Sequence, residues 1–122
     1  MNHFISLQQA IDMTTLYRQQ KENVLADEYK GTNILAISET FDRAAFDWVL
    51  AQAGCTALRI YFGMDASLNI HSIVVGVNSN NEDILPPQQS GTTTTATTDD
   101  TGIIEEGNRC PDLCGTASAL NP

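Results

Sequence analysis

The spacing of apolar residues changes after Gly54, and this change constrains the fold more than any other feature of the chain. Residues 56–62 alternate between apolar and other side chains, as a half-buried strand does. A second alternating stretch covers 70–77, and the segment 63–67 between them favours a turn. The two stretches therefore predict an antiparallel β-hairpin. The apolar side chains that share one face of its first strand are Leu58, Ile60 and Phe62.

Helical spacing precedes the hairpin. Ser6 and Gln9 match the capping box, in which each side chain satisfies an amide of the first helical turn. Apolar residues then recur every three or four positions, which predicts a helix over about 7–23. The short apolar run 34–37 fits either a brief strand or a buried extended connector.

A second helix is expected to start after a cap at Ser38 or Thr40. It should end before Gly54, because glycine readily adopts the left-handed backbone found just beyond a helix. This stretch carries the only tryptophan, Trp48, so we expect it to be the central core element. If the Trp48 ring is buried, Trp48→Ala should cost about 3–5 kcal/mol.

The C-terminal third has a different composition. Residues 88–102 read QQSGTTTTATTDDTG, a low-complexity stretch that fits a linker, or an extended strand if it finds an edge to pair with. We therefore predict an α+β domain at residues 1–87, with two helices packed on a small antiparallel sheet. The linker 88–102 and an acidic, cysteine-containing tail at 103–122 follow. A two-stranded hairpin is marginal in water, so its edges need cover from the tail, an extra strand or a second subunit.

Cys110 and Cys114 form a Cys-x3-Cys motif within RCPDLCG. Three interpretations stay open, namely packed reduced thiols, a disulfide and a metal site. A structural zinc ion needs four ligands, and the other cysteine and the two histidines are scattered along the chain. If the motif is helical with Pro111 at its first position, the two Cα atoms lie roughly 6 Å apart, within reach of a disulfide. We expect packed or disulfide-bonded thiols before metal ligands, and zinc is the metal considered.

The remaining candidates for chemistry favour structural roles. His71 lies on an apolar strand face, where a partly buried structural histidine is expected, and Cys55 follows a glycine as a small buried thiol. The polar segment 78–83 lacks the ligand offsets of an EF-hand, which favours a solvated turn over a calcium site. No phosphate-binding, zinc-protease or nucleophile-elbow motif occurs. We therefore expect no enzyme.

The charge balance limits the classes of partner. Six basic and fifteen acidic residues give a net charge of −9, which opposes binding to nucleic acid and to anionic membranes. The sequence contains no apolar run of membrane-spanning length and no signal-peptide pattern. An odd number of cysteines also fits a secreted disulfide scaffold poorly. We expect a cytoplasmic protein, with leaderless export as the alternative that leaves no sequence trace.

The order of segments carries a resemblance over most of the chain. From NHFISLQQAIDMTTLYR through LRIYFGMD and IVVGVN to RCPDLCG, it resembles small Bacteroidetes-type bacterial proteins with a C-terminal Cys-x3-Cys tail. The resemblance implies that the cysteine tail recurs in that group. It implies no activity, cofactor or site residue.

These observations favour a non-enzymatic interaction or assembly module. We expect it to bind a protein partner or, more simply, further copies of itself, through a sheet edge and the C-terminal tail. The alternative is a metal-binding or thiol-redox module that uses Cys110 and Cys114. Apart from that zinc alternative, we expect no cofactor.

Overall fold

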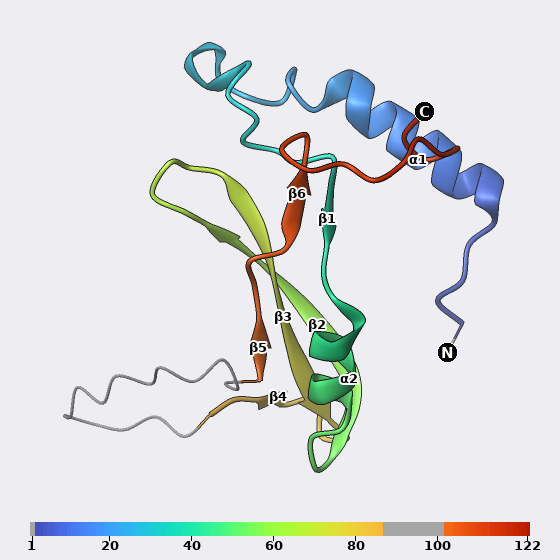
Figure 1. Cartoon of the computed structure of the whole chain (residues 1–122), viewed down its shortest axis with the longest axis vertical. Coiled ribbons are helices and arrows are strands. Elements are labelled where there is room, and N and C mark those ends of the chain that lie inside the picture. The colour runs from blue at the N-terminus through green and yellow to red at the C-terminus, as the bar shows by residue number, and fades with distance from the viewer. Residues whose placement is uncertain (1, 87–101) are drawn as a thin grey trace. The chain divides into compact units, whose positions relative to one another are not determined.

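The computed structural model describes residues 2–86 and 102–122. Within them, helices and antiparallel sheets of two and four strands confirm the predicted α+β class (Figure 1). Most of the predicted linker, residues 88–101, lies outside the described residues. In chain order the elements are α1 (Leu7–Gln20), the 3-10 helix η1 (Asp27–Tyr29), β1 (Ser38–Thr40), α2 (Arg43–Leu50), β2 (Cys55–Met64), β3 (Ile70–Asn78), β4 (Asp83–Ile84), β5 (Ile103–Ile104) and β6 (Asn108–Cys110).

The chain divides into two compact units with interleaved segments. The first unit consists of residues 1–39, 65–70 and 108–122, and the second of residues 40–64 and 71–107. The tip of the β2–β3 hairpin therefore belongs to the first unit, whereas almost all of both strands belongs to the second.

The first unit contains α1, which begins as predicted. The Ser6 hydroxyl accepts a hydrogen bond from the Gln9 amide at 3.1 Å, and the Gln9 side-chain oxygen accepts one from the Ser6 amide at 2.9 Å. The helix ends at Gln20, three residues before the predicted end. A turn over 21–24 follows in place of further helix.

The run 34–37 is the extended connector of the two alternatives, and the strand lies just after it, at β1. β1 pairs with β6, and the Ile37 amide donates to the Cys110 carbonyl at 2.9 Å. The predicted helix cap at Ser38 or Thr40 is wrong, because both residues lie in this strand. Asp42 occupies the N-cap position of α2 instead.

The second unit is built on β3. β2 pairs with one edge of β3, which agrees with the predicted hairpin, and β4 and β5 follow each other along the opposite edge. The predicted short strand near residue 84 is therefore present, and residues beyond the linker add another. On that edge of β3, Gly76 pairs with Ile84 and Val77 with Asp83, while Val74 pairs with Ile104 and Val75 with Ile103.

Helix α2 packs on one face of this sheet, where Val49, Val74 and Ile104 form the buried core. Gly76 lies directly under the helix, because a Cβ atom there would come within 3.3 Å of Val49 Cγ1. Trp48 is 43% exposed, so its ring is not fully buried. We therefore expect Trp48→Ala to lower the free energy of unfolding by less than the roughly 3–5 kcal/mol of a buried ring. Phe41, Ala45 and Phe46 complete the packing against the core.

The opposite face of β3 carries the buried residues Val75 and Val77. Asp83 is the register partner of Val77, so its side chain lies on this face. Arg59 and Tyr61 of β2 both hydrogen-bond to Asp83 of β4. Because β3 lies between these strands, the polar side chains cross over it and help to cover the two valines.

Candidate functional site

The outer edge of β2 is the first candidate site. β2 is the end strand of its sheet, and no strand among residues 2–86 and 102–122 pairs with its outer edge. It is ten residues long, whereas strands typically have about 5–6, and Arg59 is its only charged residue. A long apolar edge presents unpaired N–H and C=O groups to other chains, which is why most proteins shield such edges.

Apolar side chains line one face of this edge strand, and we call them the β2 strip. They alternate along the strand and therefore point to the same side of the sheet. All four are exposed to solvent although they are large. The strip consists of Leu58, Ile60, Phe62 and Met64, with exposed fractions of 38%, 55%, 80% and 59%.

Helix α2 is too short to cover this strip. Arg59 and Tyr61 point to the Asp83 face, so the alternating strip residues point to the other face, on which α2 packs. An eight-residue helix rises about 12 Å. A ten-residue strand extends about 33 Å. Much of the strip therefore lies beyond the end of the helix.

On the polar face of β2, the charged side chain of Arg59 belongs to a hydrogen-bond network. Arg59 donates to the Asp83 carboxylate and, at 2.5 Å, to the Asn81 side-chain oxygen, while the Tyr61 hydroxyl donates to the other Asp83 oxygen. The hydrogen bond from Tyr61, followed by that from Arg59, holds the pKa of Asp83 below its usual value despite partial burial. The hydrogen bond to Asp83 raises the pKa of Arg59. The positive charge is thus neutralised on the face away from the strip.

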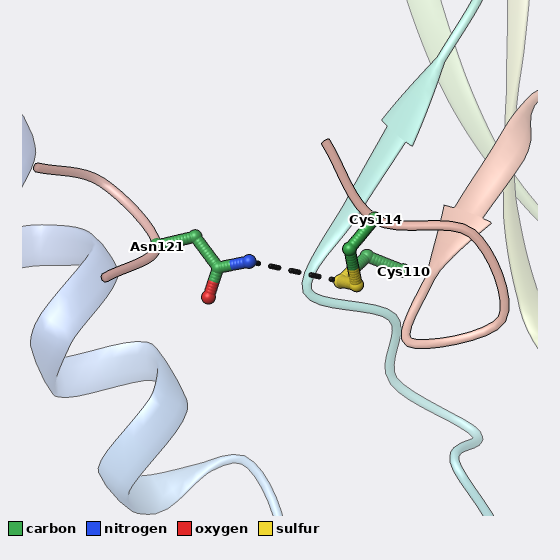
Figure 2. The surroundings of a disulfide bond; sticks show 3 residues. All are labelled: Cys110, Cys114 and Asn121. Atoms are coloured by element: carbon green, nitrogen blue, oxygen red, sulfur yellow. Dashed lines mark hydrogen bonds between the residues drawn. A yellow bond between two sulfur atoms is a disulfide. The ribbon is translucent and has the colours of Figure 1, made fainter. Parts of the chain in front are cut away.

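The second candidate site, in the first unit, is the RCPDLCG motif, in which a disulfide joins Cys110 to Cys114 (Figure 2). Cys110, at the end of β6, is only 1% exposed, whereas Cys114 is exposed. Residues 111–113 form a single turn and bend after β6 rather than a helix, so the helical geometry considered for the motif is wrong. The Leu113 amide closes this turn by donating to the Arg109 carbonyl at 2.7 Å. The two Cα atoms lie 4.5 Å apart. Metal binding by these sulfurs requires thiolates and stays a prediction for the reduced chain.

The last residues of the chain contact the disulfide. Figure 2 shows the Asn121 amide directed at the bonded sulfurs, and its Nδ2 donates to Cys110 Sγ at 3.8 Å. Asn121 is held in a tight turn, because its backbone amide and carbonyl both bond to those of Ser118 at 3.1 Å. Arg18 of α1 donates to the Leu120 carbonyl and fixes this turn on the helix.

Arg109, beside the disulfide, is a buried residue that the sequence does not single out. It is 7% exposed, and its Nη2 donates to the carbonyls of Asn33 at 3.1 Å and Ile34 at 3.0 Å. Burial raises the pKa of nearby Tyr17, an effect that the charge of Arg109 partly offsets. A single arginine outside any apolar run gives no sequence signal for burial.

The other residues considered from sequence belong neither to the β2 strip nor to the disulfide. His71 is half-buried, as expected, and its Nδ1 lies 2.9 Å from a Glu105 carboxylate oxygen. Cys55 is partly rather than fully buried, and its thiol lies 3.4 Å from the Ala57 carbonyl. The turn at 78–83 is closed by the Asn78 side-chain oxygen, which accepts two backbone amides at 2.9 and 3.0 Å.

The first unit has an apolar surface of its own. No helix in the described part of the chain is long and apolar enough to cross a membrane. An open groove of about 290 Å³ runs beside α1. The groove is lined by Met13, Leu16, Tyr17, Gln20, Lys21, Val24 and Leu35.

No protein-family model, curated protein or solved structure matches this chain.

Proposed function

We propose that this chain is a self-associating interaction module, in which two copies join through the outer edges of their β2 strands. The observation that carries the proposal is the exposed β2 strip on an unpaired ten-residue edge. Pairing there joins two sheets into one and buries the strips side by side. In the described residues the C-terminal tail pairs with the chain's own β1 and β3, so the proposal assigns contact between copies to the β2 edge.

A second copy suits this edge because an antiparallel strand pair is self-complementary about a two-fold axis. Centring the axis on Arg59 would place two like charges directly opposite, which destabilises a sheet. Centring it on Ile60 instead places Ile60 opposite its own copy and Leu58 opposite Phe62. The proposed register therefore brings apolar side chains together across the contact.

Electrostatic repulsion between copies works against the contact. Each chain carries a net charge of −9, but within β2 the only charged residue is Arg59, which is paired with Asp83. The repulsion is therefore long-range and open to screening by salt. We expect association to strengthen as ionic strength rises, the opposite of a contact held by ion pairs.

Hydrogen exchange measured residue by residue by NMR tests the proposed contact. Amides along an unpaired edge exchange fast, so alternate β2 amides should exchange more slowly as protein concentration or salt rises. Amides of α1 provide an internal control and should not change. Protection that grows elsewhere while β2 exchange stays constant would assign association to another surface.

A further inference from the structure

We propose that the Cys110–Cys114 disulfide is a thiol–disulfide exchange site with a fixed direction. A thiolate of an incoming small molecule or protein attacks Cys114 Sγ, and Cys110 leaves as the thiolate. The site lies within the first unit and does not depend on the β2 contact, so either proposal can fail without the other.

Accessibility sets the direction of attack. Exchange proceeds when a thiolate approaches one sulfur in line with the S–S bond and displaces the other. Cys110 is 1% exposed at the end of β6, whereas Cys114 and its neighbours in the turn are exposed. An incoming thiolate can therefore reach the Cys114 sulfur, and the buried sulfur becomes the leaving group.

Asn121 stabilises the charge that develops on that leaving group. Its Nδ2 already donates to Cys110 Sγ at 3.8 Å, and a hydrogen bond strengthens when its acceptor becomes an anion. A leaving thiol with a lower pKa also departs faster. Asn121 thus touches the reacting sulfur itself, while the turn with Ser118 and the contact from Arg18 to Leu120 position its amide.

The scaffold allows one sulfur to move while the other stays fixed. The Cys110 backbone is held by the β1–β6 pairing and by the Ile37 amide. Cys114 lies in the turn that follows β6, outside both strands. After cleavage, Cys114 can carry the incoming group away from Cys110 without loss of strand pairing.

The exchange balances with a dithiol as the reductant. Its first thiolate forms a new S–S bond with Cys114 as the Cys114–Cys110 bond breaks and the electron pair moves to Cys110 Sγ. The second thiolate of the dithiol then attacks the first sulfur of the same dithiol, which is bonded to Cys114, and the Cys114 thiolate is released. The dithiol is oxidised to a disulfide and the cysteine pair is reduced by two electrons. The two protons that the dithiol releases to solvent on ionising are taken up by the two cysteine thiolates at neutral pH.

The direction of attack can be tested with the full oxidised chain and glutathione, a monothiol that leaves the first adduct in place. After rapid alkylation, cleavage before Asp112 separates Cys110 from Cys114 for mass spectrometry. We expect glutathione on Cys114 and the alkyl group on Cys110. Glutathione mainly on Cys110, equal labelling of both, or no reaction in the folded chain would each overturn the proposal.

The role of Asn121 is tested by Asn121→Leu, with Asn80→Leu in the exposed 78–83 turn as the matched control. Loss of a hydrogen bond to a developing anion should slow reduction by glutathione about tenfold. It should also raise the pKa of the Cys110 thiol in the reduced chain, followed by thiolate absorbance. The control should change neither value. An unchanged rate and pKa in Asn121→Leu would remove Asn121 from the mechanism.

Discussion

Replacing Arg109 with alanine should lower the free energy of unfolding by about 2–5 kcal/mol. Arg109 is 7% exposed, and its guanidinium donates to the carbonyls of Asn33 and Ile34. Without it, the exposed Asn33 carbonyl turns to water and the Ile34 carbonyl keeps only the Ile70 amide at 2.9 Å, so the chain loses two hydrogen bonds from a charged donor. Such bonds contribute about 1.5–3 kcal/mol each, and less for the exposed Asn33 carbonyl. The buried stem of the side chain is also lost, which leaves a cavity next to Cys110.

Urea unfolding, followed by circular dichroism, measures this loss. Arg43→Ala is the matched control, because Arg43 is exposed and forms only a surface ion pair with Asp47 at 3.2 Å. Such pairs contribute about 0.3–0.5 kcal/mol. If the two variants lose similar stability, the buried hydrogen bonds of Arg109 do not stabilise the first unit more than a surface ion pair does.

Ile60→Lys should weaken self-association by at least about 100-fold. In the proposed register residue 60 lies opposite its own copy, so the variant places two ammonium groups face to face. It also removes the burial of two half-exposed isoleucines, roughly 1 kcal/mol each. Together with the charge repulsion this exceeds the 2.8 kcal/mol or so that corresponds to a 100-fold change. The fold itself should be little affected, because Ile60 is 55% exposed.

Ile5→Lys is the control for this variant. Ile5 is 57% exposed, nearly the same as Ile60, but it precedes α1 in the first unit. Sedimentation velocity should show a dissociation constant close to that of the unchanged chain for Ile5→Lys and a monomer for Ile60→Lys. Equal weakening by both variants would point to a general effect of charge rather than to a β2 contact.

The features that depend on neighbouring residues could be predicted from sequence. The capping box at Ser6 and Gln9 forms because both partners lie within one turn. The hairpin follows from two alternating stretches joined by a short turn. Gly54 has the predicted left-handed backbone, with φ of +79°. Its predicted place just beyond the helix is wrong, because α2 ends at Leu50 and Gly54 lies in the turn before β2. Each of the confirmed features depends on interactions over a few residues or across one turn.

The features that depend on residues far apart in the chain could not be predicted from sequence. Ser38 and Thr40 have the side chains of helix caps, yet they form β1 because its partner β6 comes from the far end of the chain. β5 likewise pairs with β3 across a long sequence separation. Trp48 is large and apolar, but Val49 is the α2 residue buried against Val74 and Ile104, and Trp48 stays 43% exposed.

The candidate sites show the same division. The alternating pattern correctly places Leu58, Ile60 and Phe62 on one face of β2. The sequence also indicates that the edges of a hairpin need cover. The exposure of these three side chains depends on the length of α2 and was not predictable. For Cys110 and Cys114, the spacing allowed a disulfide, but the buried and exposed positions of the two sulfurs depend on β6 and the turn after it.

Sedimentation equilibrium of the full chain tests the central claim, self-association, most directly. A single chain has a mass of 13.3 kDa. We predict an average mass that rises with concentration toward twice this value, and that rises further with added salt. A mass of 13.3 kDa at every concentration up to the solubility limit would contradict the account.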